Sequence, residues 1–302
     1  MRFTNGRRFT AISTALLGGN TLFHGCNESH KSAWLPKVAA GETTLTLAAY
    51  ELAGRYNLAH VETSAKEAGS DFVINGSKAF VPNAGTSDKL VVSARTSGET
   101  KDAEGITLFL VDRGAPGISI TNVETMDHQR RATLTLKNVK AGRDQVVGSP
   151  GKGLPVLEKT IDRAIVALCA EMLGGMQAAL DMSVAYSKER VQFGKPIGSF
   201  QALKHKAANM YVALETARSA AYYAAMATDE DMPDMRAAVS CAKALCSDAY
   251  LQITKDAIQI HGGIGYTDEC DVHLYYKRAI VSSVTFGDAN YHRDRYATLK
   301  GF

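Results

Sequence analysis

The pattern of hydrophobic and polar positions changes twice along the 302 residues of the chain. Residues 1–43 have the apolar spacing of short helices. From residue 44 to about 148, short β-branched segments alternate apolar and polar positions, which is typical of strands. From about residue 149, apolar residues recur every third or fourth position, which is the period of an amphipathic helix. The pattern therefore predicts a helical segment, a β-domain and a helical domain, in that order.

The β-rich part consists of short segments separated by turn residues. Asn75 and Gly76 lie between two such segments, and a type I′ turn favours this pair because both central positions need a positive φ. A hairpin is therefore predicted there. Tight turns without intervening helices predict an antiparallel sheet or barrel. The segments are "TLTLAAY", "DFVINGSKAFV", "KLVVSAR", "ITLFLV" and "ATLTLKNV".

The helical part is predicted to contain four long helices. The first continues to about Glu189, the second follows Gln201, the third runs from about Met235 to Ile260, and the fourth covers residues 272–297. Gly262 and Gly263 are suited to end the third helix. Four long helices with short connections predict an antiparallel four-helix bundle.

Composition and charge exclude several classes of function. A net charge of +3 without a Lys/Arg-rich run argues against nucleic-acid binding. No apolar run reaches the roughly 18 residues that a membrane span needs, so no membrane contact is expected. Five cysteines without a CxxC pair indicate free thiols in a reducing cytoplasm. The histidines never pair at i, i+4 with acidic neighbours, so no metal site is predicted.

The beginning of the chain, "GRRFTAISTALLGGNTLF", superficially resembles a twin-arginine export signal. Arg7 and Arg8 precede a semi-apolar run that ends before Cys26. The run contains Asn20 and paired glycines, however, and it lacks a small-x-small cleavage site. We therefore favour a helix of the folded protein over an export signal.

Two connectors carry residues that could bind a ligand. "RVQFGKPIGSFQ" (190–201) offers a cation at Arg190 and an amide at Gln201, and "HGGIGYT" (261–267) offers exposed backbone N–H groups. Together they could bind a phosphate-bearing ligand, because they lie at the ends of consecutive helices. The alternatives are a connector whose Phe193 and Phe200 plug the bundle, and a simple helix C-cap.

Five segments, in the right order, resemble the acyl-CoA dehydrogenase family. The two long ones are "ERVQFGKPIGSFQALKHKAANMYVALETARS" and "QIHGGIGYTDECDVHLYYKRA", and upstream lie "WLPKVAAGE", "FVINGSKAFVPNAGTSDKLVVSAR" and "GITLFLVD". The resemblance implies an α+β multidomain fold. Residues 1–43 would be a remnant of the N-terminal helical domain, 44–148 an antiparallel β-barrel-like middle domain, and 149–302 a C-terminal four-helix bundle that drives tetramer formation.

The resemblance also implies a flavin cofactor and a reaction. Family members take the α-proton of an acyl-CoA thioester with a carboxylate while the β-hydride moves to N5 of FAD, and an electron-transfer flavoprotein accepts the electrons. The residues that match the family's contacts to the adenosine diphosphate part of a neighbouring subunit's FAD are Arg190, Phe193 and Gln201. Those that approach the same cofactor are Gln259, Gly262 and Gly263.

The catalytic base departs from the usual pattern. The family's Glu in "YEGT" is replaced here by Phe286 in "VTFGD", and a phenyl ring cannot take a proton. Asp288 is expected to be solvated or to cap a helix. Some members place the base on the first bundle helix before an arginine, where this chain has Asp162 followed by Arg163. Asp162 is therefore the candidate base, and the alternative is a surface aspartate in an i, i+4 network with Glu158.

The flavin side departs as well. The family's "TEPGAGSD" becomes "YELAGRYN" (50–57), and "WIT" becomes Phe80, Val81 and Pro82. Pro82 offers neither a hydroxyl nor an N–H. Since the half-site that serves a neighbour is kept, the resemblance favours a heterotetramer with a paralogous subunit over a homotetramer, as in the small subunits of heteromeric bacterial enzymes such as pimeloyl-CoA dehydrogenase. The alternatives are a non-catalytic partner subunit and a decayed, inactive fragment.

Overall fold

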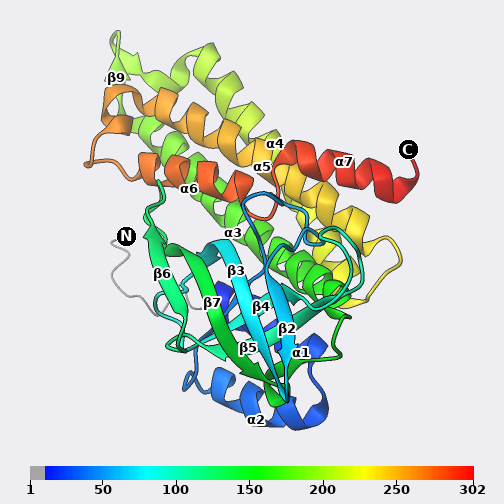
Figure 1. The fold of residues 1–302 in the computed structure, drawn as a ribbon. Helices are drawn as coiled ribbons and strands as arrows, with labels where there is room; N and C mark the ends of the chain where they lie inside the picture. The colour runs from blue at the N-terminus through cyan, green and yellow to red at the C-terminus, as the bar shows by residue number, and fades with distance from the viewer. Residues whose placement is uncertain (1–10) are drawn as a thin grey trace. The chain divides into compact units, whose positions relative to one another are not determined.

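The computed structural model describes residues 11–302, and the chain divides into two compact units between Ala164 and Ile165. This division falls inside a long helix, α3 (Gly153–Glu189), so α3 contributes to both units. The first unit is built around a β-sheet and the second from helices (Figure 1). The domain boundary expected at residues 148 and 149 stays a prediction.

The β unit is built on an eight-stranded sheet with the order β6-β7-β3-β2-β4-β5-β8, in which β1 pairs with β4. Most neighbouring strands are antiparallel, as expected, but β1 and one residue pair of β2 run parallel to β4, so the sheet is mixed. The strands are β1 (Leu45–Ala48), β2 (Ser64–Ala68), β3 (Asp71–Pro82), β4 (Lys89–Arg95), β5 (Ile106–Asp112), β6 (Ile118–Val123), β7 (Arg131–Gly142) and β8 (Val146–Val147).

Alternating apolar residues of this sheet form one core. Phe72 and Ile74 of β3 and Leu134 of β7 are fully buried, as is Phe109 of β5. The rings of Phe72 and Phe109 meet edge to face with centroids 5.2 Å apart. The two-residue period read from the sequence therefore corresponds to the buried face of the sheet.

The hairpin predicted at Asn75 and Gly76 is wrong. Strand β3 runs straight through both residues, and its pairing with β7 shifts register between Ile74 and Gly76, which marks a β-bulge. Gly76 has a φ of +151°, and a Cβ there would lie 2.6 Å from the Cα of Thr63, so only glycine fits. The true turn is at Gly69 and Ser70, because Ala68 of β2 pairs directly with Asp71 of β3.

The segment before the sheet is helical, as predicted. It consists of a π-helix, η1 (Ala11–Gly19), followed by α1 (Asn20–Gly25) and α2 (Glu28–Ala39). Leu17 and Leu22 are buried, and the Thr14 hydroxyl donates to the carbonyl of Leu45 in β1 at 3.1 Å. The described part of the run that resembles an export signal is thus packed into the β unit, whereas Arg7 and Arg8 lie outside the described residues.

Arg95, at the end of β4, ties the loops beside the sheet together. Its guanidinium donates to six backbone carbonyls at 2.8–3.4 Å, which belong to Ala59, Val61, Ser97, Thr100, Asp102 and Glu104. Burial lowers the pKa of Arg95, while Asp102, Glu51 and Glu99 raise it. Because arginine is always charged in proteins, the guanidinium remains a full donor.

We therefore expect Arg95→Met to lower the free energy of unfolding by about 2–3 kcal/mol, since several carbonyls would lose a charged donor. Urea unfolding followed by circular dichroism measures this. Arg113→Met is the matched control, because exposed Arg113 donates to one carbonyl, that of Gly85, and should change stability by less than about 0.5 kcal/mol. Equal losses in the two variants would show that Arg95 does not hold these loops.

The helical unit confirms three of the four predicted helices. These are α3, which ends at Glu189 as predicted, α4 (Gln201–Asp229) and α5 (Met235–His261). The fourth is not continuous, because it is split into α6 (Val272–Val284) and α7 (Ala289–Lys300). Phe286 and Gly287 have φ values of +61° and +118°, which a helix cannot contain, and the Asp288 side chain caps α7 by accepting from the N–H of Tyr291.

Helix α3 qualifies the expectation that no apolar run is long enough to span a membrane. Within the part of the chain that the structure describes, it is long and apolar enough to cross a membrane by length and composition alone. Core helices of soluble proteins pass the same test, and 44% of its apolar window is buried. Met172, Met176 and Leu180 lie in the core, and Arg278 of α6 forms a bidentate ion pair with Glu171. We therefore assign α3 to the protein core.

Candidate functional site

The connector between α3 and α4 is a small β-hairpin. Strands β9 (Val191–Gln192) and β10 (Lys195–Pro196) pair antiparallel around a two-residue turn at Phe193 and Gly194, whose φ values are +53° and +78°. Two successive positive φ values are the mark of a type I′ turn. Phe193 is 91% exposed, so the expectation that it plugs the bundle is wrong.

The backbone of Phe193 is strained at this turn, because a bulky side chain disfavours the left-handed conformation. Its ring meets the edge of Phe200 with centroids 6.1 Å apart, and the ammonium of Lys195 lies 4.5 Å from the Phe200 centroid. Strained, exposed residues of this kind cluster at ligand sites. The hairpin therefore presents an aromatic ring in a defined position on the surface of the helical unit.

The end of α5 presents open backbone. Gly262 caps the helix with a φ of +66°, as predicted, and a short 3₁₀ turn, η4 (Gly262–Tyr266), follows. A Cβ added at Gly262 or Gly263 would meet nothing within 4 Å, so another group can approach the backbone closely there. Gln259 is exposed one turn earlier on α5.

The structure brings these two segments together. The ring of Tyr186, near the end of α3, stacks on His261 with centroids 4.6 Å apart and an interplanar angle of 24°. The N–H of Arg190 donates to the carbonyl of Tyr186 at 2.9 Å, while His261 immediately precedes Gly262. Figure 1 shows β9 and the orange connection after α5 at the same end of the bundle. The hairpin and the glycine segment thus form one local surface.

The residues on this surface fit the adenosine diphosphate part of FAD. Arg190 and Gln201 are exposed, and Gln201 is the first residue of α4, where backbone N–H groups favour an anion. The open backbone at Gly262 and Gly263 suits a phosphate, and an aromatic ring suits a nucleobase. The six residues that the resemblance implied as cofactor contacts stay a prediction: Arg190, Phe193, Gln201, Gln259, Gly262 and Gly263.

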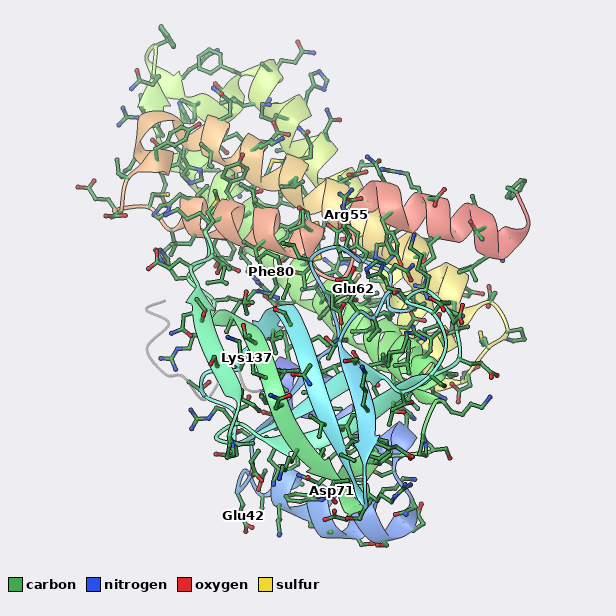
Figure 2. The ribbon with its side chains drawn as sticks, viewed as in Figure 1. Glu42, Arg55, Glu62, Asp71, Phe80 and Lys137 are labelled. Carbon is green, nitrogen blue, oxygen red and sulfur yellow. The ribbon has the colours of Figure 1, made fainter. Side chains whose placement is uncertain are left out.

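The β unit contributes a different surface near the end of β3. Phe80 has a φ of +52° and is 52% exposed, whereas Val81 is buried and the carbonyl of Pro82 accepts from the Thr46 hydroxyl at 2.6 Å. The N–H of Ala79 donates to the carbonyl of Tyr50, which ties residues 50–57 to this end of the strand. Figure 2 shows Arg55 and Phe80 there, with Asp71 at the opposite end of β3. The surface offers an aromatic face and no hydroxyl at position 82.

A buried ion pair lies beneath this surface, and nothing in the sequence revealed it. The ammonium of Lys78 donates to Glu51 at 2.7 Å and to the Ser93 hydroxyl at 2.9 Å. Glu51 also accepts from the backbone N–H groups of Glu62 and Thr63. Burial would raise the pKa of Glu51, but Lys78 and these hydrogen bonds together lower it, while burial lowers the pKa of Lys78 to about 8.

Glu51, His60 and Glu62 lie close enough together to resemble a metal site. The Glu51 carboxylate, however, already accepts from Lys78 and two backbone N–H groups, and His60 pairs with Glu62 at 3.2 Å. Hydrogen bonding therefore accounts for this cluster.

The two candidate catalytic positions lie on different elements. Asp162 is on α3 and is 1% exposed, so the alternative of a surface aspartate is wrong. Phe286 lies in the turn between α6 and α7, and Asp288 caps α7 as expected. Burial keeps bulk water from the Asp162 carboxylate, and its role as the base stays a prediction.

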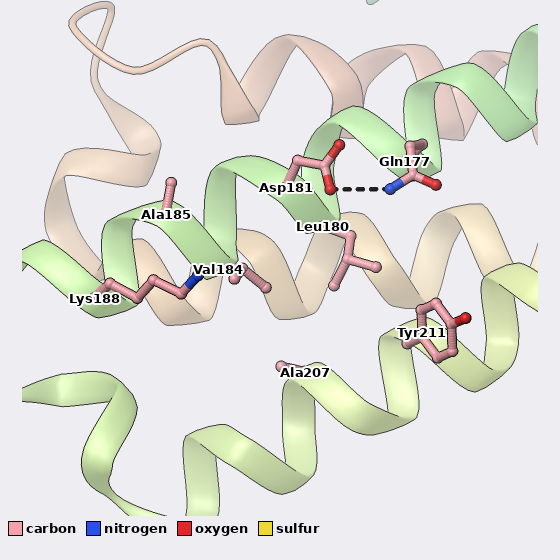
Figure 3. A pocket seen from close by; sticks show the side chains of 8 residues that line it. All are labelled: Gln177, Leu180, Asp181, Val184, Ala185, Lys188, Ala207 and Tyr211. Carbon is pink, nitrogen blue, oxygen red and sulfur yellow. Dashed lines mark hydrogen bonds between the residues drawn. The ribbon is translucent and has the colours of Figure 1, made fainter.

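The helical unit also has a pocket of about 400 Å³ between α3 and α4 (Figure 3). The Gln177 side chain donates to Asp181 at 2.9 Å on its α3 side. No predicted cofactor residue lines it, so the pocket is separate from the surface described above. Its lining residues are Gln177, Leu180, Asp181, Val184, Ala185, Lys188, Ala207 and Tyr211.

Comparison with known families accounts for both units. Residues 46–139 match the acyl-CoA dehydrogenase middle domain, and residues 151–298 match the acyl-CoA dehydrogenase C-terminal domain. A 3-(aryl)acrylate reductase of Clostridium sporogenes is 35% identical over 283 residues, which cover 92% of this chain and 74% of that protein. The chain belongs to the acyl-CoA dehydrogenase family.

Solved structures agree with this assignment to the acyl-CoA dehydrogenases. Butyryl-CoA dehydrogenase from Megasphaera elsdenii matches with a TM-score of 0.90 and 29% identity, over 96% of this chain and 76% of that one. A chain in the structure described as the electron transferring flavoprotein of Acidaminococcus fermentans matches with a TM-score of 0.91 and 29% identity, over 97% and 77%. The α+β fold predicted from the sequence is thus confirmed, and the relatives are FAD-dependent.

Proposed function

We propose that this chain takes part in the FAD-dependent α,β-dehydrogenation of an acyl-CoA thioester. The observation that carries the proposal is the joint surface of the 190–201 hairpin and the 259–263 segment. It combines an exposed cation, exposed amides and open backbone on a chain of this family. Arg190, Phe193 and Gln201 would hold the adenosine diphosphate part of the cofactor, together with Gln259, Gly262 and Gly263.

The chemistry divides between the cofactor and the chain. Bound FAD would accept the hydride that leaves the β-carbon of the acyl group. Asp162 would take the α-proton at a carboxylate oxygen, and its burial would keep water from competing for that proton. Phe80 offers an aromatic face on the flavin side, and the Pro82 position offers no hydroxyl. The base therefore differs from the glutamate that the family usually places at position 286.

The relatives support a substrate class and an electron acceptor. Relatives named for butyryl-CoA and for 3-(aryl)acrylate support a short or aromatic acyl group on CoA. The match to a chain described as an electron transferring flavoprotein supports that kind of protein as the acceptor. All five cysteines are free thiols, which is consistent with the proposed location in the cytoplasm.

A second candidate function is a non-catalytic partner that completes the FAD site and tetramer of a paralogous subunit. Phe286 at the usual base position and Pro82 on the flavin side favour it. Under either function we favour a heterotetramer over a homotetramer, because the residues that would serve a neighbour's cofactor are retained. A homotetramer of this chain that oxidises acyl-CoA unaided would contradict that preference.

The cofactor assignment predicts a specific loss. Arg190→Gln removes the cation from the hairpin, and a lost charge-assisted hydrogen bond should raise the Kd for FAD by about 10-fold to 100-fold. Fluorescence titration of the FAD-depleted assembly with FAD measures this.

The control for this loss is Lys188→Gln, which removes an exposed cation two residues earlier, at the separate pocket. It should bind FAD as the wild type does. An unchanged Kd in Arg190→Gln would remove Arg190 from the cofactor site.

A further inference from the structure

The turn between α6 and α7 is held by two buried side chains, one from α5 and one from α7. Lys243 of α5 is fully buried, and its ammonium donates to the carbonyls of Ser283 at 3.0 Å and Gly287 at 2.8 Å, and to the Ser247 hydroxyl at 2.9 Å. All three donor positions of the ammonium are therefore used. None of the three acceptors is a carboxylate.

His292 of α7 binds the carbonyl of Phe286, which lies between Ser283 and Gly287 in the chain. Its Nε2 lies 3.1 Å from the carbonyl oxygen of Phe286. Burial, together with the charges of Lys243 and Arg295, lowers the pKa of His292 to about 3, so the ring is neutral and carries one proton. Because a carbonyl only accepts, that proton is on Nε2. Lys243 and His292 thus bind the carbonyls of residues 283, 286 and 287.

Burying the Lys243 ammonium in this arrangement costs free energy, which indicates a role beyond capping the end of α6. A buried ammonium without a carboxylate partner is unfavourable, and burial lowers the pKa of Lys243 to about 8. A cation stabilises the free carbonyls at the C-terminus of a helix, which would explain the hydrogen bond from Lys243 to Ser283 in the last turn of α6. It would not explain the hydrogen bond to Gly287, which lies beyond the end of α6. Phe286, moreover, is kept in the left-handed region at +61°, which a bulky residue adopts only where its surroundings impose it.

We propose that Phe286 determines acyl-group specificity and that Lys243 is the positioning residue that fixes it, through the carbonyls of the α6–α7 turn. The inference rests on the proposed function and on the resemblance, which implies that position 286 is where the family's base meets the α-carbon of the acyl group. A phenyl ring held at that position narrows the space for the substrate, whereas a mobile ring would yield to bulkier acyl groups. The turn then selects the substrate instead of supplying a base.

The test compares three variants of the loaded assembly. Phe286→Ala removes the ring, Lys243→Met removes the ammonium, and Lys255→Met is the control that removes an exposed ammonium from the same helix, α5. Hydrogen exchange of a peptide covering residues 281–292 reports on the turn without any reaction. The ratio of kcat/KM for a 3-arylpropionyl-CoA to that for butyryl-CoA reports on specificity.

We expect Lys243→Met to speed exchange in this peptide at least 10-fold. We also expect it to raise the kcat/KM ratio at least 10-fold toward the bulkier substrate, in the same direction as Phe286→Ala. Lys255→Met should change neither quantity. Exchange at the wild-type rate in Lys243→Met would overturn the inference, and so would a wild-type ratio in both Lys243→Met and Phe286→Ala.

If Lys243→Met does not fold, His292→Leu removes the other donor to the turn and is judged by the same two measurements. Failure of the proposed function can be distinguished from failure of this inference. A wild-type assembly that oxidises no acyl-CoA refutes that function, while the exchange rates still decide whether Lys243 fixes the turn.

Discussion

Asp162→Asn is expected to lower the rate of acyl-CoA-dependent flavin reduction by about 10²-fold to 10⁴-fold, the usual contribution of a positioned general base. Asparagine keeps the size of the side chain but cannot take the α-proton. The FAD content should not change, because Asp162 is outside the hairpin and the glycine segment. Anaerobic stopped-flow mixing with acyl-CoA, monitored in the visible flavin band, measures the rate.

Glu158→Gln is the matched control for this experiment. It neutralises a carboxylate one turn earlier on α3, and it should reduce flavin at the wild-type rate. An Asp162→Asn enzyme that also reduces flavin at the wild-type rate would exclude Asp162 as the base and would favour the non-catalytic function.

Lys78→Met is expected to lower the free energy of unfolding by about 3–5 kcal/mol, because it leaves the buried Glu51 carboxylate without its cation. Lys89→Met breaks an ion pair of the same length, 2.7 Å, but the carboxylate of its partner Asp112 is largely exposed, so the loss should be below about 1 kcal/mol. Urea unfolding of both variants gives the comparison. Similar losses in the two would show that the buried pair carries no special stability.

The same pair predicts a pH dependence. The folded protein lowers the pKa of Glu51 below 4.5, so the unfolded chain binds more protons as the pH falls through this range. The stability that Glu51 contributes is therefore complete above about pH 4.5 and is lost as the pH falls through the folded pKa. We expect the difference between wild type and Glu51→Gln to shrink there, and a constant difference from pH 7 to pH 3 would contradict this linkage.

The sequence predicted those features of the fold that depend on local hydrophobic periodicity and on helix-capping residues. The ends of α3 and α5 were correct because Glu189 precedes a glycine- and proline-rich connector and Gly262 has the positive φ of a helix cap. The Asn75–Gly76 hairpin failed because its local turn preference was outweighed by pairing of β3 with β7 along its whole length. Gly287 and Asp288 were a readable signal for the break between α6 and α7, since a glycine followed by a capping residue ends one helix and begins another.

The candidate site could be predicted only in part. The hairpin and glycine segment were found by their unusual residues, but their contact through Tyr186 and His261 depends on the folded bundle. The same holds for Glu51 and Lys78, which are 27 positions apart, and for Lys243 and Gly287, which are 44 apart. Long-range polar contacts of this kind leave no periodic trace in a sequence.

The most direct test of the proposed function is the visible spectrum of the chain, purified with any subunit it retains and loaded with FAD. The loaded protein is then mixed anaerobically with butyryl-CoA or with a 3-arylpropionyl-CoA. We expect a bound flavin band that at least one of these thioesters bleaches. A preparation that retains no flavin after loading, or a flavin that neither thioester bleaches, would contradict it.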